Sequence, residues 1–171
     1  VRPPIVTRLP YTTLFRSRSE KAITDPQELV DVIRGQKYMT LALCSDGEPY
    51  LVTMNYGFDA EASCFYFHCA GEGKKLDILK KSPVVWGQVL EDCGYIVGKC
   101  DHAYRTVEFK GTVTFLEDRP AKRHALELMI DQLEPDPASV KARFSKEDAF
   151  DKVTIGQVTV AFMTGKKSLD E

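Results

Sequence analysis

Short segments of alternating apolar and polar residues, separated by turns of hairpin length, limit what this chain can fold into. Residues 38–45 form the first segment, and the Asp46-Gly47 pair, a strong hairpin signal, leads into the second over residues 49–58. Four more alternating runs follow, at residues 64–69, 84–91, 104–117 and 153–167. We therefore expect a mainly β domain, a six-stranded antiparallel β-barrel with helical additions.

Helices are expected in the gaps between these runs. Asp25 is the N-cap of the first helix, Glu28 completes its capping box and Gly35 ends it. A longer helix begins after Asp118, and two short helices span residues 137–151. Strands do not alternate with long helices and no G-x-G-x-x-G follows a strand, which excludes a doubly wound dinucleotide-binding sheet.

The length of 171 residues suits a single domain. Residues 1–20 contain LPYTTLFRS, which resembles translated adaptor DNA, so we interpret them as a non-native or disordered leader. The domain proper spans residues 21–168, and residues 169–171 form a short tail. No run of about 18 apolar residues is present, so no membrane-spanning helix is expected.

Charge and cysteine content exclude several classes of partner. The chain has 23 basic and 25 acidic residues, a net charge of −2, which gives no broad surface for nucleic acid or anionic membrane. The odd number of cysteines and the lack of C-x-x-C spacing indicate free thiols in a reducing cytoplasm. These cysteines are Cys44, Cys64, Cys69, Cys93 and Cys100.

A loop rich in glycine and lysine follows the third alternating run. The sequence CAGEGKKLDIL passes Gly71 and Gly73 and then enters a short helix with Lys74 and Lys75 at its start. Helix starts present unpaired N–H groups and a partial positive charge, and glycines let a ligand approach closely. The loop is therefore a candidate phosphate site, to which His68 could donate a further hydrogen bond. The alternative is a solvated turn with two surface lysines.

The segment 49–58 has two different faces. The face expected in the core consists of Tyr50, Val52, Met54, Tyr56 and Phe58. The other face consists of Leu51, Thr53, Asn55 and Gly57. Its mixture of apolar and hydrogen-bonding groups suits a flat heterocycle, although a half-exposed barrel strand would show the same pattern.

In the order of its motifs, the chain resembles the FMN-binding split-barrel proteins, the relatives of pyridoxamine 5′-phosphate oxidase. Within them it resembles the nitroimidazole-resistance (Nim-like) flavoproteins. The motifs, over residues 22–168, are PYLVTMNYGF, YFHCAGEGKKLDIL, SPVVWGQV, YRTVEFKG and EDRPAKRHALELMI. The resemblance implies a split β-barrel of the FMN-binding type and a homodimer that holds FMN between its two barrels.

The resemblance also implies which residues bind the flavin. One strand lines the ring, the end of the next touches the ribityl phosphate, a basic pair lies near the phosphate, and a later strand contacts the flavin again. The matching residues are Leu51, Val52, Thr53, Met54, Asn55, Phe67, His68, Lys74, Lys75, Tyr104, Arg105 and Thr106.

Two departures bear on the activity. The oxidases have an arginine at the start of the ring strand and a lysine at its end, where this chain has Tyr50 and Asn55. Oxidation of pyridoxamine phosphate itself is therefore not expected. The expected function is an FMN-binding oxidoreductase that passes electrons from NAD(P)H or another reduced carrier to a small acceptor. The alternative is a non-enzymatic flavin carrier, sensor or storage protein, and the sequence identifies no catalytic residue.

FAD, a deazaflavin and haem are the alternatives to FMN. FAD and a deazaflavin would need a similar cradle, and a haem would use His68 and His102 as candidate axial ligands. Cys69, Cys93 and Cys100 are suitable metal ligands by type, but their spacing matches no common metal-binding pattern. We therefore expect no metal site.

Overall fold

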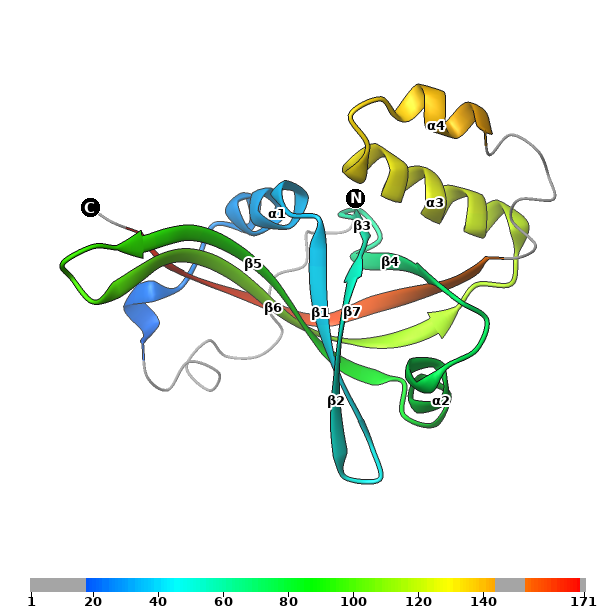
Figure 1. The fold of residues 1–171 in the computed structure, drawn as a ribbon, viewed down its shortest axis with the longest axis horizontal. Helices are drawn as coiled ribbons and strands as arrows, with labels where there is room; N and C mark the ends of the chain where they lie inside the picture. The colour runs from blue at the N-terminus through cyan, green and yellow to red at the C-terminus, as the bar shows by residue number, and fades with distance from the viewer. Residues whose placement is uncertain (1–17, 144–152, 170–171) are drawn as a thin grey trace.

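The computed structural model describes residues 18–143 and 153–169. Its framework is one antiparallel sheet of seven strands in the order β2-β1-β5-β6-β7-β4-β3 (Figure 1). The strands are β1 (Tyr38–Ser45), β2 (Glu48–Asn55), β3 (Gly57–Asp59), β4 (Cys64–Cys69), β5 (Val84–Ile96), β6 (Asp101–Phe115) and β7 (Thr154–Ser168). A mainly β fold with helical additions is thus confirmed, but the strand number is seven rather than six.

The additional strand arises where the predicted run 49–58 breaks at Tyr56. Before the break β2 pairs with β1, and after it β3 pairs with β4. The two edges of the sheet are therefore consecutive pieces of one segment, and the covalent chain joins them. The Tyr56 ring is fully buried and its hydroxyl donates a hydrogen bond of 2.5 Å to the main-chain oxygen of Ile33. Alternation alone does not show this change of partner.

The main apolar core fills the space that this closure creates. Phe65 of β4 stacks on Phe109 of β6 with 4.2 Å between ring centroids, and Phe58 and Tyr56 pack against Phe65 from the crossover. The alternation of β1 and β5 places every second side chain in this core and the others outside. The outward-facing residues are therefore the ones available to a ligand or a partner.

The helices are α1 (Pro26–Gly35), α2 (Lys74–Lys81), α3 (Arg119–Leu133) and α4 (Pro137–Arg143), with a short turn of 3₁₀-helix, η2 (Ser19–Lys21), before them. Asp25 and Asp118 cap α1 and α3, as expected, by accepting from main-chain N–H groups. Glu28 is expected in a capping box, but its carboxylate instead accepts two hydrogen bonds from Lys167. Residues 1–17 of the predicted leader and the region of the second short helix beyond Arg143 lie outside the described residues.

Two helices, α2 and α3, pack against the sheet. Ile78 and Leu79 of α2 enter the main core beside β1. The apolar side of α3, with Ala125, Leu126 and Met129, packs on the outer face of β4 (Figure 1). No helix among the described residues is long and apolar enough to cross a membrane.

The β5–β6 hairpin is longer than the sequence predicts and projects beyond α1 (Figure 1). The alternating runs predicted strands at 84–91 and 104–117, whereas pairing continues to Ile96 and resumes at Asp101. Most residues of the extension are exposed on both faces, so they carry no apolar alternation to reveal a strand.

Substitution of Gly57 tests how tightly the crossover between β2 and β3 packs against α3. A Cβ at this position would lie 2.7 Å from the main-chain nitrogen of Met129, which α3 holds in place. We expect Gly57→Ala to lower the free energy of unfolding by about 1–3 kcal/mol, because backbone cannot move aside as a side chain can. Urea denaturation measures the change.

Gly35→Ala is the matched control for that variant. An added Cβ at Gly35, the last residue of α1, meets no atom within 4 Å. Its effect should be neutral or slightly stabilising, by about 0.4–1 kcal/mol. Equal losses of stability in both variants would contradict the packing described for the crossover.

Candidate functional site

The start of α2 is open to a ligand. Gly73 is the N-cap, with φ +128°, and no side chain caps the helix. The amides of Leu76 and Asp77 turn back to the main-chain oxygen of Gly73, so the first-turn amides of Lys74 and Lys75 carry the exposed N–H character of a helix start. The predicted strand–loop–helix arrangement of this segment is present in the structure.

Lys74 and Lys75 both lie against β2. The Lys75 ammonium is 3.5 Å from the sulfur of Met54, and the Lys74 ammonium is 4.7 Å from the centre of the Tyr50 ring. Neither lysine forms a salt bridge with a carboxylate of the described residues, whereas Lys141 and Lys167 do. The barrel edge at β2 therefore carries two positive charges that have no counter-charge within residues 18–143 and 153–169.

The faces of β2 are those expected from the alternation. Met54 is buried and Val52 half-buried on the inner side, while Leu51 is 67% exposed on the outer side. The hydroxyl of Thr53 is 2.9 Å from that of Thr40 on β1. Asn55 donates from its side-chain amide to the main-chain oxygen of Lys37, which leaves the side-chain oxygen as an acceptor.

Two neighbouring hollows lie on the outer face of the sheet and share Gln88 and Glu108. We call them the tryptophan hollow, about 290 Å³, and the histidine hollow, about 390 Å³. The tryptophan hollow is lined by Thr40, Ala42, Leu51, Trp86, Gly87, Gln88 and Glu108. The histidine hollow is lined by Gln88, Leu90, Asp92, His102, Tyr104, Thr106, Glu108 and Lys166. Predicted residues from β2 and β6 thus lie along one continuous surface.

Thr106 is held rigidly in this surface. Its side chain is nearly buried and donates a hydrogen bond of 3.1 Å to the main-chain oxygen of Val89. Because the hydroxyl hydrogen is used in this way, the oxygen can meet a ligand only as an acceptor. Tyr104 lies beside it, two residues earlier on the same face of β6.

Two predicted residues on β4 lie apart from each other. Phe67 is fully buried in the core, and His68 points to the opposite face of the strand. There His68 lines a hollow of about 160 Å³ formed mainly by apolar residues of α3, among them Leu126 and Met129. The side chain of His68 is thus on the α3 side of the sheet. This is the outer face of β4, but His68 does not line the tryptophan hollow or the histidine hollow.

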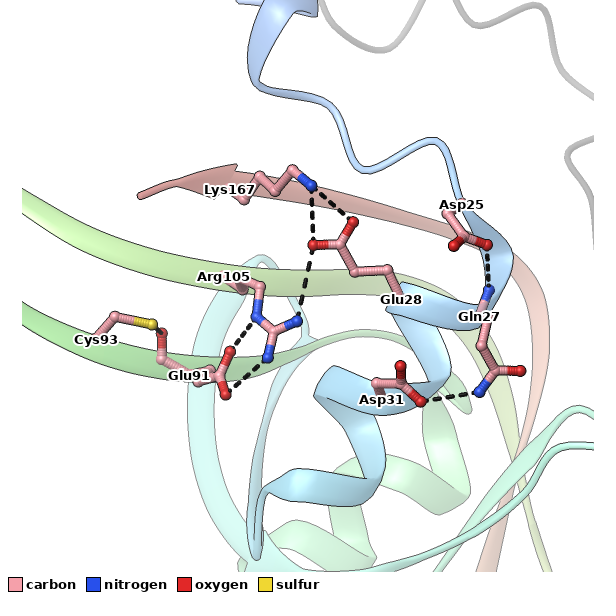
Figure 2. A network of polar contacts seen from close by, with 8 residues as sticks. All are labelled: Asp25, Gln27, Glu28, Asp31, Glu91, Cys93, Arg105 and Lys167. Carbon is pink, nitrogen blue, oxygen red and sulfur yellow. Dashed lines mark hydrogen bonds and ion pairs between the residues drawn. The ribbon is translucent and has the colours of Figure 1, made fainter. Parts of the chain in front are cut away.

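Arg105 points to the inner face of the sheet, away from Tyr104 and Thr106. Its guanidinium donates two hydrogen bonds to Glu91 and lies 3.7 Å from Glu28 on α1, which also binds Lys167 (Figure 2). Hydrogen bonding to Glu91 raises the pKa of Arg105 above its usual value. This network fastens α1 to β5, β6 and β7.

Most residues that line the two hollows were not predicted from the sequence. Trp86, Gln88 and Glu108 could have been found, because alternation places them on the same face as Leu51 and Thr106. Alternation does not predict the contact between His102 and Asp92, because this contact depends on the strand register in the unpredicted extension of the β5–β6 hairpin.

Metal and haem ligation gain no support from the side-chain positions. Within residues 18–143 and 153–169, no group of three or more His, Cys, Asp or Glu side chains is arranged to hold a metal ion. The two histidines considered for haem line different hollows, His68 the one beneath α3 and His102 the histidine hollow on the β5–β6 hairpin.

An antiparallel sheet closed by one crossing segment, with a basic helix start at its edge strand, defines a split-barrel protein. The family model described as pyridoxamine 5′-phosphate oxidase matches residues 25–167. The chain belongs to this family, which confirms the resemblance seen in its motifs. No curated protein sequence matches the chain.

Solved structures agree with this assignment. A candidate 5-nitroimidazole antibiotic resistance protein from Bacteroides thetaiotaomicron is 27% identical, with a TM-score of 0.72 over 85% of this chain and 86% of that chain. An FAD-binding protein from Mesorhizobium loti is 20% identical, with a TM-score of 0.61 over 84% and 95% of the two chains. An FAD- and haem-binding protein from Mycobacterium smegmatis is 19% identical, with a TM-score of 0.73 over 88% and 76%. The latter two likenesses show the fold alone.

The Arg105 network yields a prediction about stability. Arg105→Gln leaves Glu91 and Glu28, both largely shielded, without their shared cation. We expect the free energy of unfolding, measured with urea, to fall by about 1–3 kcal/mol. Lys141→Gln, which breaks a more exposed pair with Asp131, should cost less than about 1 kcal/mol. Equal effects would show that the network does not fasten α1.

Proposed function

We propose that this protein is an FMN-binding oxidoreductase. In this proposal FMN is held with its phosphate at the start of α2 and its ring along β2. When bound, the flavin supplies the two-electron chemistry, and the protein supplies position, electrostatics and access. Electrons come from NAD(P)H or another reduced carrier and pass to a small planar acceptor.

One observation carries the proposal: in the part of the chain that the structure describes, the two lysines at the uncapped start of α2 have no salt-bridge partner. A buried or half-buried cation normally has a counter-charge, and Lys75 has none among the described residues. A phosphate dianion would supply it, and the first-turn amides of α2 would add hydrogen bonds. The residues present therefore fit a mononucleotide phosphate.

The ring is assigned to the side of β2 that faces outward. Leu51 and the tryptophan hollow offer apolar surface, and Thr53 and Asn55 offer a hydroxyl and an amide oxygen for polar ring atoms. Thr106 and Tyr104 lie further along the same surface. Arg105 and Phe67 face the interior of the barrel and His68 lies beneath α3, so any contribution from them to binding is through the shape of the barrel.

We propose further that the protein is a homodimer in the cytoplasm. Three large apolar side chains of the outer face, Leu51, Trp86 and Leu90, are between 42% and 67% exposed in the single chain. A second copy would cover such a surface. The five cysteines are all free, which suits a reducing compartment.

Lys75→Ala tests the phosphate site. We expect it to weaken FMN binding by about 1–3 kcal/mol, the scale of one charge-assisted hydrogen bond. Titration of apo-protein, followed by flavin fluorescence, measures the change. Lys80→Ala, at the other end of the same helix, removes an equal charge and should leave the affinity unchanged. Wild-type affinity in the Lys75 variant would place the phosphate elsewhere.

Turnover separates an enzyme from a flavin carrier. We expect FMN-loaded protein to oxidise NADH or NADPH with nitro or quinone acceptors faster than the same concentration of free FMN, because the protein positions both reactants. Absorbance of the nicotinamide measures the rate. A rate equal to that of free FMN would favour the alternative, a carrier, sensor or storage protein.

A further inference from the structure

A histidine–carboxylate pair lies in the histidine hollow, outside the set of residues assigned to FMN. The Nε2 atom of His102 is 2.6 Å from an oxygen of Asp92, and both residues line the hollow. Tyr95 is directly opposite His102 on the hairpin, with their rings 6.4 Å apart. Tyr104, opposite Asp92, continues the same face toward Thr106.

A β-bulge creates this arrangement. Asp92 and Tyr95 are three positions apart, so a regular strand would direct them to opposite faces. The register shifts between Asp92 and Gly94, which leaves Cys93 as the extra residue, and Gly94 adopts φ +98°. Both side chains therefore reach the outer face. The amide of Gly94 also donates to Asp92, at 2.8 Å, and fixes the carboxylate.

The hydrogen bonds determine what His102 offers a ligand. Donation from His102 and from the Gly94 amide lowers the pKa of Asp92, so Asp92 is an ionised carboxylate that only accepts. The proton shared with Asp92 therefore resides on Nε2, and Nδ1 is left for a ligand. Nδ1 accepts a hydrogen bond in the neutral ring and donates one in the imidazolium.

The charges of the histidine hollow argue against a phosphate there. Asp92 and Glu108 contribute two carboxylates, against the single ammonium of Lys166. A volume of about 390 Å³ and the apolar side chain of Leu90 suit a small ring without charge. The two lysines at the start of α2, to which the proposed function assigns the phosphate, line neither hollow.

We propose that the histidine hollow binds the electron acceptor, that the acceptor is a quinone, and that His102 hydrogen-bonds one quinone oxygen. This inference rests on the proposed oxidoreductase function. A quinone oxygen accepts a hydrogen bond, and the corresponding hydroquinone hydroxyl donates one. An imidazole oriented by a carboxylate serves both forms, because its free nitrogen can donate or accept. A fixed donor such as an amide or an ammonium would serve only the oxidised form.

Binding can be measured without turnover. The chain has three histidines and one tryptophan, so isotope labelling of these residues gives few side-chain signals in an NMR spectrum. The probe is duroquinone, whose fully substituted ring does not add to exposed thiols such as Cys93 and Cys100. It is titrated into protein loaded with oxidised FMN, in the absence of any reductant.

We expect duroquinone to shift the ring signals of His102 in a saturable manner and to leave those of His68 and His124 in place. His102→Phe should weaken this binding about tenfold, the effect of losing one hydrogen bond, when followed by the signals of labelled Tyr104. His124→Phe is the matched control, because His124 is also paired with an aspartate, Asp59, at 3.2 Å, but on α3. It should not change the affinity.

Several outcomes would overturn the proposal. The first is that duroquinone does not shift the His102 signals. The second is that the His102→Phe variant and the wild type bind duroquinone with equal affinity. The third is that duroquinone shifts only the Trp86 signals. Failure of the proposed function is a separate result. In that case FMN does not bind at α2, while duroquinone still shifts His102 in the flavin-free protein. If the His68 and His124 signals of the His102→Phe variant match those of the wild-type protein, the variant is folded.

Discussion

The rest of the structure depends on the crossing of one segment from β2 to β3. At this point Tyr56 is buried and its hydroxyl donates to the main-chain oxygen of Ile33 at the end of α1. Gln132 of α3 donates to the same oxygen and accepts from the amide of Phe58. Burial raises the pKa of Tyr56, so it remains a donor at physiological pH. These few bonds satisfy the main chain where it leaves one edge of the sheet and joins the other.

Because the crossing segment joins the two edges of the sheet, side chains point either into the barrel interior or to its outer face. The interior takes the aromatic residues and, toward the hairpin, the ion pairs of Arg105 beneath α1. The outer face keeps Leu51, Trp86 and Thr106 along one surface. The edge strand β2 also meets the start of α2, where Lys74 and Lys75 contact Tyr50 and Met54, so two cations lie at the edge strand that carries Leu51. A ligand with an anionic tail and a flat ring suits that combination, and this is why the flavin proposal follows from the fold.

The sequence predicted the elements with strong local signals. Alternation located β1, β2, β4 and the inner halves of β5 and β6, and capping aspartates located α1 and α3. It did not predict β3, because three residues carry no periodicity, nor the hairpin extension, because solvent lies on both of its faces. Among the candidate site residues, Lys74 and Lys75 contact Met54 and Tyr50 of β2, on the strand face opposite Leu51 and Thr53, and Tyr104 and Thr106 line one hollow. Their role in binding stays a prediction. Arg105 was grouped with Thr106 because they are adjacent in sequence, yet adjacent strand residues face opposite ways.

What the sequence determined by itself is therefore local: which segments are strands, where helices start, and that two lysines follow a glycine turn. These properties depend on residues a few positions apart, so the backbone preferences of single residues and the period of the apolar pattern predict them. Only the tertiary structure decided that Tyr56 changes the pairing partner, that Glu28 binds Lys167 rather than its own helix, and that a bulge brings Asp92 to His102. Each depends on strand register or on contacts between distant segments, which no local pattern encodes.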